Sequence, residues 1–252
     1  MQQQWRVEND VRRIHFAYVF GMWHYAGIPC GYLPLLSRIR NHFKGIFHFS
    51  VFSQKILFRI HTKMVKVAVN GFGRIGRLVF RFAWEDPTLE VVHVNDLCSC
   101  ESAAYLLKYD SVHGTWDRDV KVLEGGDAFS VVEENGACTN VSFTREKDYT
   151  NIDFRSMGVE MVLECTGKFL TVKSLSPYFD LGIQRVVVSA PVKEEGALNV
   201  VLGCNHHLLT EDTKIVTNAS CTTNCLAPIV KVIKENFGIK HGCITVRSLI
   251  QK

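Results

Sequence analysis

The stretch that most constrains this chain begins at position 65, where an apolar strand leads into three closely spaced glycines. The strand Val65–Asn70 is followed by Gly71, Gly73 and Gly76, and then by a helical pattern over Arg77–Trp84. In such a unit the first glycine permits a tight turn, the second lets the backbone approach a pyrophosphate, and the third lets helix and strand pack closely. Free N–H groups at the start of the helix favour an anion. The pattern therefore predicts a dinucleotide-binding turn.

An acidic residue closes the next strand. The apolar strand Leu89–Asn95 ends at Asp96, 25 positions after Gly71. A carboxylate there can accept hydrogen bonds from both ribose hydroxyl groups of the adenosine half of a dinucleotide. The negative charge of Asp96 would repel the 2′-phosphate of NADP, so Asp96 favours NAD, while use of NADP stays open. Asp96 strengthens the prediction of a dinucleotide-binding turn, because the glycine motif alone would also fit an ordinary turn.

Strands and helices alternate through the rest of the chain. Repeated strand–helix units predict an α/β fold, a Rossmann-type doubly wound and mostly parallel sheet with helices on both faces and ligands at the carboxyl ends of its strands. Thr166, Gly167 and Ser189 follow two such strands, and they are either cofactor contacts or ordinary strand-end turns. The expected helices are 101–109, 175–181 and 226–237, and the expected strands are 119–123, 129–133, 141–144, 159–164, 185–189 and 199–203.

Charge divides the chain at position 63. Residues 1–63 hold nine Lys or Arg and two acidic residues, a net charge of +7, whereas the remainder carries −3 within a total of +4. A body that is net negative does not fit a nucleic-acid-binding protein. The basic residues therefore belong to a separate leader, and we predict no nucleic-acid partner.

The leader permits two interpretations. Residues 14–37 contain no charged residue, but histidines, prolines and glycines interrupt them, so they make a poor membrane helix. Residues 38–63 contain no acid and several Arg, Lys, Ser and Phe, as an organelle transit segment does. Either the leader is upstream sequence without a role and the protein is cytoplasmic, or it directs the chain to a plastid or another organelle. Neither interpretation includes a membrane partner.

The nine cysteines show no paired spacing, which favours a reducing compartment over a disulfide framework. Two close pairs, Cys98 with Cys100 and Cys221 with Cys225, lack a second Cys/His pair at zinc-site spacing. We therefore expect no metal.

Cys221 stands out by its position. A polar segment, Thr217–Cys225, precedes the amphipathic helix Leu226–Phe237, so Cys221 lies at a helix N-terminus. Unpaired N–H groups and the helix dipole stabilise a thiolate there, which is the reactive form of cysteine. The alternative is an inert buried cysteine, and Cys225, one turn later, is expected to pack rather than react.

Four motifs carry a family resemblance: Asn70–Arg77, Lys108–Gly114, Glu164–Gly167 and Ala219–Pro228. Together they closely resemble phosphorylating glyceraldehyde-3-phosphate dehydrogenase over about residues 64–245. The family implies an NAD-binding Rossmann domain followed by an α+β catalytic domain, with glyceraldehyde 3-phosphate and inorganic phosphate as substrates and a homotetramer as the assembly. Its cysteine forms a thioester, a hydride passes to NAD, and phosphate releases an acyl phosphate.

The resemblance assigns roles to individual residues. Cys221 matches the nucleophile, and Ser220 and Thr222 match residues that bracket substrate and phosphate. Lys147 falls where the family usually has an arginine near the adenine, and Leu97 replaces a residue of its usual Asn-Asp-Pro motif. The cofactor-binding residues so implied are Asn70, Gly71, Phe72, Gly73, Arg74, Ile75, Gly76, Asp96, Lys147, Thr166, Gly167 and Ser189.

The resemblance ends before the family's catalytic histidine, which should fall 27 positions after Cys221, where Ser248 stands. We therefore expect a leader at 1–63, an NAD-binding domain at 64–219 and a truncated start of the catalytic domain at 220–252. Such a chain is expected to be nearly inactive, to form no tetramer and to expose the apolar face of its last helix. The alternatives are an NAD-binding module without catalysis, or a relative that uses erythrose 4-phosphate or arsenate.

Overall fold

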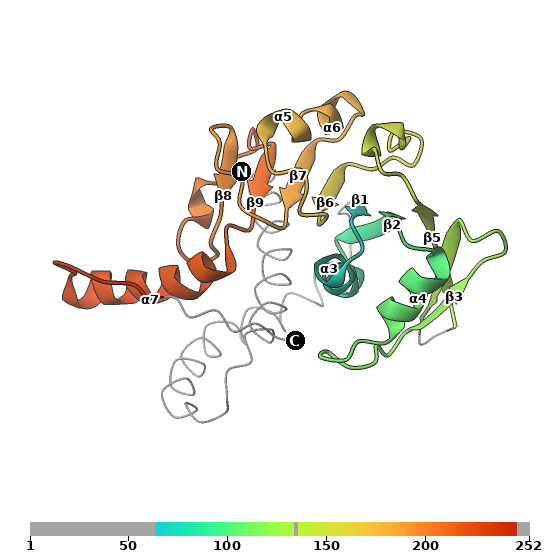
Figure 1. Cartoon of the computed structure of the whole chain (residues 1–252), viewed down its shortest axis with the longest axis horizontal. Coiled ribbons are helices and arrows are strands. Elements are labelled where there is room, and N and C mark those ends of the chain that lie inside the picture. Colours follow the sequence, from blue (N-terminus) through green and yellow to red (C-terminus); the bar gives the residue numbers. More distant parts are fainter. Residues whose placement is uncertain (1–63, 134–135, 246–252) are drawn as a thin grey trace.

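The computed structural model describes residues 64–133 and 136–245. Within this part of the chain, nine strands form one sheet in the order β3-β4-β5-β2-β1-β6-β7-β9-β8 (Figure 1). The predictions for residues 1–63 and for the end of the chain lie outside the described residues. The strands are β1 Val65–Asn70, β2 Leu89–Asn95, β3 Asp119–Val122, β4 Ala128–Val132, β5 Cys138–Thr144, β6 Met161–Glu164, β7 Arg185–Val188, β8 Ala197–Asn199 and β9 Ile215–Thr217.

Most neighbouring strands are parallel. The pairs β1–β2, β1–β6, β2–β5, β6–β7, β7–β9 and β8–β9 are parallel, and only β3–β4 and β4–β5 are antiparallel among the described pairs. The three antiparallel strands form a meander at one end of the sheet, as short strands joined by turns do. The Rossmann-type, mostly parallel sheet predicted from the sequence is confirmed.

Alternate residues of β1 pack into two different cores, one on each face of the sheet. Val67 and Val69 belong to the cluster that contains Phe80 of α3, whereas Ala68 belongs to the cluster that contains Tyr178. Successive side chains of a strand point to opposite faces, so a strand covered on both faces is apolar throughout. Helices α3 (Arg74–Trp84) and α4 (Cys100–Lys108) cover one face, and α5 (Val172–Leu175) and α6 (Pro177–Asp180) cover the other (Figure 1). The short η2 (Tyr149–Asn151) packs on the same face as α5 and α6.

The helix expected at 175–181 is confirmed only in part, because α6 lies within this range but a separate helix, α5, ends at Leu175. Thr171 begins α5 with a capping box, in which its side chain and that of Ser174 each accept from the other's backbone N–H. Pro177 begins α6, and a proline at the first helical position lacks the N–H that would continue the preceding helix. The break therefore falls at the proline.

The strand expected at 199–203 is also wrong, since β8 ends at Asn199. The side chain of Asn205 turns the following segment away: Oδ1 accepts from the N–H of Val201 at 2.7 Å, and Nδ2 donates to the carbonyl of Asn199 at 2.9 Å. These bonds take backbone groups that a longer strand would use. The sequence prediction also missed β9, which supplies the inner partner of β8.

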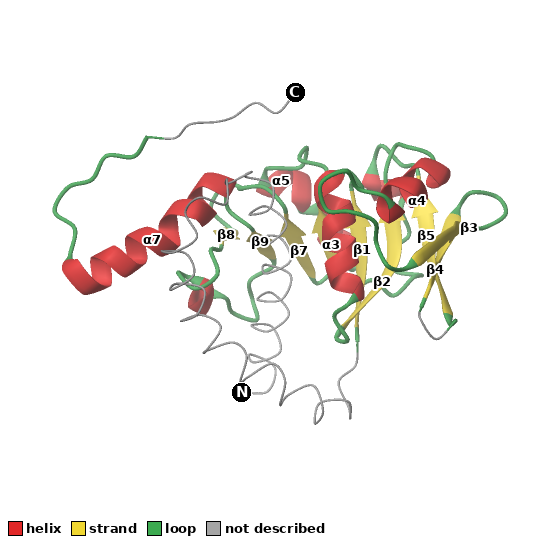
Figure 2. Cartoon of the chain, turned by 90° about the horizontal axis from the view of Figure 1, so that it is seen from below, coloured by secondary structure: helices red, strands yellow, loops and turns green. Residues whose placement is uncertain are grey.

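Helix α7 (Cys221–Phe237) begins five residues before the expected start and projects from the β8–β9 end of the sheet (Figures 1 and 2). Its apolar residues Ile229, Val232, Ile233 and Phe237 are exposed, Phe237 by 86%. Their spacing places them along one side of the helix. The expected exposure of an apolar face is therefore confirmed for the described residues.

A search of the described helices finds none with the length and hydropathy needed to cross a bilayer.

Candidate functional site

The loops that carry the predicted site residues leave one edge of the sheet. Because the central strands are parallel, their carboxyl ends meet at the same edge. Backbone hydrogen bonds continue between neighbouring strands just past those ends. The N–H of Gly71 donates to the carbonyl of Asn95, and the N–H of Cys165 donates to that of Asn70. In the same way, Ser189 donates to Glu164 and Asn218 donates to Val188, all at 2.7–3.0 Å. The loops after β2, β1, β6, β7 and β9 are thus fixed side by side.

The three glycines of the turn meet different surroundings. A Cβ on Gly71 would lie 2.5 Å from the backbone nitrogen of Thr166, and its φ of 88° favours glycine. A Cβ on Gly76 would lie 2.0 Å from the carbonyl oxygen of Gly71. A Cβ on Gly73 would meet nothing within 4 Å. Gly71 and Gly76 are therefore required for packing, while Gly73 leaves open space above the turn where a phosphate group fits.

Asp96 is tied to the glycine turn. Its Oδ2 accepts from the N–H of Phe72 at 2.6 Å, and its Oδ1 accepts from the N–H of Cys98 at 3.0 Å. These bonds hold the carboxylate beside the turn, and its remaining lone pairs can accept from ribose hydroxyl groups. Together with the open side of Gly73, the residues present fit an NAD molecule.

A buried carboxylate lies beneath these loops. Glu164, at the end of β6, is 1% exposed. Its Oε2 accepts from Asn70 and from the Tyr178 hydroxyl, both at 2.8 Å, and its Oε1 accepts from the backbone and hydroxyl of Thr166. Burial raises the pKa of the Glu164 carboxyl, and the hydrogen bonds from Thr166, Tyr178 and Asn70 act in the opposite direction. The carboxylate anchors the turn that follows β6.

The polar network continues through the sheet to a buried histidine. Asn95 Nδ2 donates to Asn70 Oδ1, and Thr144 Oγ1 donates to Asn95 Oδ1, both at 2.8 Å. His93 Nε2 lies 3.1 Å from Thr144 Oγ1, and its Nδ1 lies 2.7 Å from Ser142 Oγ. Burial lowers the pKa of His93 to about 4, so the ring is neutral at pH 7 and serves the network as a hydrogen-bonding group.

Cys221 is the first residue of α7 and is exposed. Ser220 is the N-cap, and its Oγ accepts from the N–H of Thr223 at 3.1 Å and lies 3.0 Å from Thr222 Oγ1. The cap satisfies one of the unpaired N–H groups of the first turn, and the dipole there favours negative charge. The structure therefore places the thiol beside hydroxyl groups at a helix N-terminus. Cys225 is exposed too, so the expectation that it packs is wrong.

Some predicted cofactor residues have no free side chain. Phe72 is 2% exposed, with its ring 5.5 Å from that of Phe80, so only its backbone faces the turn. Both polar atoms of the Asn70 side chain, Nδ2 and Oδ1, are used in the network. Arg74, Lys147 and Gly167 are exposed, while Ile75, Thr166 and Ser189 are half-buried.

The other close cysteine pair is less reactive. Burial raises the pKa of Cys98 to about 11, with hydrogen bonding to Asp96 adding to the shift, and burial raises the pKa of Cys100 to about 11 as well. A thiol with such a pKa is protonated at pH 7 and is a poor nucleophile and metal ligand. No group of metal-ligating side chains is found within residues 64–133 and 136–245.

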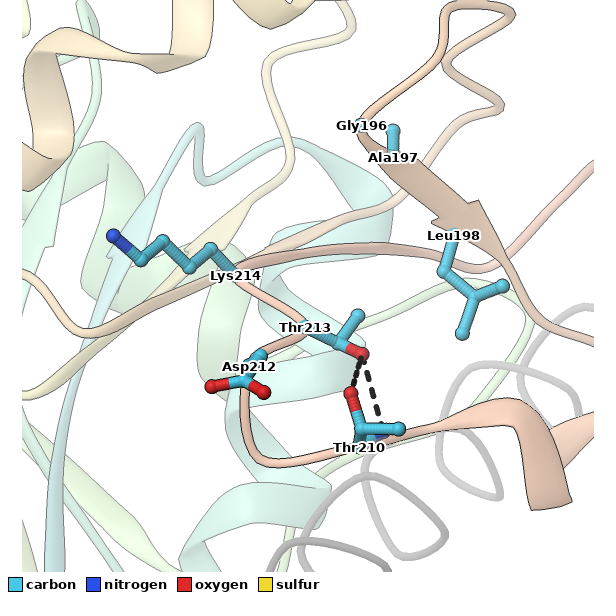
Figure 3. Close-up of a pocket in the computed structure, with 7 residues that line it drawn as sticks. All are labelled: Gly196, Ala197, Leu198, Thr210, Asp212, Thr213 and Lys214. Carbon is cyan, nitrogen blue, oxygen red and sulfur yellow. Dashed lines mark hydrogen bonds between the residues drawn. The ribbon is translucent and has the colours of Figure 1, made fainter.

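A hollow of about 430 Å³ lies away from these loops (Figure 3). It is lined by residues at the start of β8 and just before β9, which is the amino end of these parallel strands. In the close-up, Thr210 and Thr213 are hydrogen-bonded to each other, and Lys214 points away from them. Because Cys221 follows the opposite end of β9, this hollow is not part of the candidate site.

Comparison with known proteins agrees with this geometry. The family model "Glyceraldehyde 3-phosphate dehydrogenase, NAD binding domain" matches residues 65–172, and the model of the "C-terminal domain" of the same family matches residues 220–252. The chain belongs to the glyceraldehyde-3-phosphate dehydrogenase family. The fold and the family expected from the sequence are thus confirmed.

Relatives of this glyceraldehyde-3-phosphate dehydrogenase family member show how much of a family sequence the chain spans. Glyceraldehyde-3-phosphate dehydrogenase 3 of a Nostoc species is 51% identical over 183 residues, covering 72% of this chain and 52% of the relative. The cytosolic glyceraldehyde-3-phosphate dehydrogenase of Leishmania mexicana is 45% identical, and the glyceraldehyde-3-phosphate dehydrogenase of Geobacillus stearothermophilus is 43% identical, each with 72% of this chain and 52% of the relative covered. The chain therefore spans about half the length of these relatives.

Sequence reasoning missed the residues that support the site from below. Glu164, Asn95 and Tyr178 do not face the open edge, but their side chains hold the loops that do. A signal was present, because three neighbouring strands each end in a polar residue, at Asn70, Asn95 and Glu164. Buried polar groups need partners, so three at one edge indicate a shared network.

Proposed function

We propose that this chain carries the dinucleotide site and the nucleophile of a phosphorylating aldehyde dehydrogenase that acts on glyceraldehyde 3-phosphate. The observation that carries the proposal is the position of Cys221. It is an exposed thiol at a capped helix N-terminus, on the edge of the sheet where the glycine turn and Asp96 also lie. A nucleophile and a cofactor site on one edge suit a reaction between an aldehyde and NAD.

The dinucleotide would be held by the glycine turn and Asp96. The open side of Gly73 and the N-terminus of α3 would receive the pyrophosphate. Asp96 accepts from the ribose hydroxyl groups and disfavours a 2′-phosphate, so NAD is the preferred cofactor. Arg74, Ile75, Lys147, Thr166, Gly167 and Ser189 are proposed as further contacts. NAD, when bound, supplies a hydride acceptor.

Cys221 would attack the aldehyde carbon as a thiolate. The helix N-terminus favours the negative charge on sulfur, and the hydroxyl groups of Ser220 and Thr222 lie where they can orient the aldehyde or the phosphate. After oxidation the carbon is bound to sulfur as a thioester. Inorganic phosphate then breaks that bond, and the thiolate leaves as the acyl phosphate forms.

Two measurements on the expressed chain test this proposal. The chain is titrated with NAD, and the rates at which iodoacetamide modifies each cysteine are measured by peptide mass spectrometry. We expect saturable NAD binding and faster modification of Cys221 than of the exposed Cys225 and Cys243. Absence of NAD binding, or equal rates at the three thiols, would contradict the proposal.

A turnover assay separates an enzyme from a binding module. The chain is mixed with NAD, glyceraldehyde 3-phosphate and phosphate, and reduced cofactor is followed by absorbance, with Cys221→Ser as the control. Turnover that the substitution abolishes supports catalysis by this chain. Binding of NAD without turnover favours an NAD-binding module without catalysis.

Cellular location and assembly belong to the same proposal. One relative is named as cytosolic, and we propose the cytoplasm for this protein as well. The homotetramer that the family resemblance implies is a proposal for the whole protein, and sedimentation velocity would measure it.

A further inference from the structure

One buried amide holds the loop that precedes Cys221. Asn224 lies in the first turn of α7 and is 8% exposed. Its Nδ2 donates to the backbone carbonyl of Asn218 at 2.6 Å and to that of Ser220 at 2.9 Å. Both amide hydrogens are therefore used on the two residues that flank Ala219.

Ala219 has a conformation that needs such restraint. Its φ of 52° makes it the one non-glycine residue with positive φ among the described residues. Side chains with a Cβ disfavour this left-handed region. The N–H of Ala219 also donates to Oγ1 of Thr217, the last residue of β9, at 3.1 Å. The turn is thus held by β9 on one side and by Asn224 on the other.

The side-chain amide of Asn224 is oriented so that both of its hydrogen atoms are donated to the loop. Asn224 Oδ1 is buried and accepts no hydrogen bond within the part of the chain that the structure describes. Turning the amide over would place this oxygen against two carbonyl oxygens, which cannot donate. Buried acceptors without a partner are rare in folded proteins. Here the side chain leaves one acceptor unused and keeps both donors on the loop.

We propose that Asn224 is a positioning residue for the nucleophile. Its amide fixes residues 218–220 so that Ser220 caps α7 and Cys221 is presented at the open edge of the sheet. The inference rests on the proposed function, in which Cys221 attacks the aldehyde. Without the two hydrogen bonds, Ala219 leaves its left-handed conformation, and the first turn of α7 no longer holds the thiol in place.

The test is the rate of alkylation by iodoacetamide in the full chain. We expect Asn224→Ala and Asn224→Asp to slow modification of Cys221 relative to Cys225 by about five- to tenfold, because each removes two buried hydrogen bonds. Cys100, which is 1% exposed, must stay unreactive in both variants, since its modification reports unfolding.

Asn236 provides the matched control on the same helix. Its Nδ2 donates to the carbonyl of Val232 at 2.8 Å, but the contact is exposed and far from the turn. Asn236→Ala and Asn236→Asp make the same chemical changes, and they should leave the Cys221 rate unchanged. A rate that falls equally in both pairs of variants would overturn the inference.

A second substitution separates positioning from general weakening. Glycine adopts the left-handed region readily, so Ala219→Gly should restore the Cys221 rate of the Asn224→Ala variant by about fivefold. If Cys221 reacts faster than Cys225 in the unsubstituted chain but the Asn224 variants keep that rate, the positioning role is wrong and the proposed function stands. If Cys221 is no faster than Cys225 in the unsubstituted chain, the proposed function itself fails.

Discussion

Gly71 and Gly73 belong to one turn, but a side chain would affect stability at the first position and cofactor binding at the second. Gly71→Ala would force a Cβ to within 2.5 Å of the Thr166 backbone at a φ of 88°. We expect the free energy of unfolding to fall by at least about 2 kcal/mol, since the strained φ and the clash both oppose folding. Urea denaturation followed by circular dichroism measures this loss of stability, and an unchanged denaturation midpoint would contradict the clash.

Gly73→Ala is the companion prediction. A methyl group there meets nothing within 4 Å, so stability should change by less than about 1 kcal/mol. The methyl group would nevertheless fill the space proposed for the pyrophosphate. We expect a weaker NAD affinity at nearly unchanged stability, as measured by titration and denaturation of the same sample; undiminished affinity would place the pyrophosphate elsewhere.

Asp96→Asn tests the choice of cofactor. Removing the charge should weaken NAD binding by about tenfold and strengthen NADP binding, because a ribose acceptor is lost and a 2′-phosphate is no longer repelled. Asp86→Asn is the control, since the Asp86 carboxylate also accepts from a backbone N–H and from a hydroxyl group but precedes β2 instead of following it. Fluorescence titrations with both dinucleotides give the ratio of the NAD and NADP affinities. If Asp96→Asn leaves this ratio unchanged, Asp96 is not part of the site.

At the level of single residues, the sequence indicated the backbone roles better than the side-chain roles. Gly71 and Gly76 show the close approaches that their motif implies. Phe72 and Asn70 were expected at the cofactor, yet both side chains are buried. Which atoms of a motif face outward depends on the elements that pack against it, and a local pattern does not contain those elements.

Helix α7 shows how an element can be predicted in type and misjudged in extent. The amphipathic pattern from Leu226 indicated a helix, but the start at Cys221 depends on the cap at Ser220 and on the bonds from Asn224. The split of the helix expected at 175–181 has a similar cause, because Pro177 and the Thr171 cap each begin a new turn. Capping interactions decide where helices begin, and several residue types can supply them.

The exposed face of α7 leads to a prediction about solubility. Val232→Lys combined with Phe237→Lys should reduce light scattering by concentrated protein, since exposed apolar patches promote association. The two residues are 54% and 86% exposed, so the unfolding midpoint should stay within error. Asn236→Lys adds a charge beside this face without removing apolar surface, and it should reduce scattering less. Equal scattering from all three proteins would contradict the prediction.

Across the whole molecule, the network from His93 to Glu164 joins residues of different strands that lie up to 94 positions apart in the sequence. His93 packs against Phe154 on one face of the sheet, with ring centroids 6.0 Å apart. Its neutral ring joins Ser142 to Thr144, both on β5. Protonation would place a charge where burial leaves no water to solvate it.

The resulting pH dependence has a definite sign. The folded-state pKa of His93, about 4, lies below the unfolded value of 6.5. Its contribution to stability is therefore complete above pH 6.5 and is lost as the pH falls towards 4. We expect about 1.4 kcal/mol to be lost by pH 5.5 and about 3 kcal/mol by pH 4. Denaturation between pH 7 and pH 4 measures the loss.

His93→Gln should flatten this pH dependence, because the substituted side chain cannot take up the proton. His241→Gln, at an exposed position after α7, is the control and should keep the full slope. If His93→Gln shows the same loss between pH 6.5 and 4 as the unsubstituted chain, buried His93 is not the cause.

The sequence by itself determined the fold class and the family, because the glycine turn, the acidic strand end and the cysteine motif are local patterns that each require a definite backbone. Short apolar runs likewise indicated most of the strands. Only the tertiary structure decided that Glu164, Asn70 and Asn95 form one buried network, and that Asn224 holds the loop before Cys221. The physical reason is that a buried polar group must find its partner in space, and parallel strands bring together residues that lie far apart along the chain.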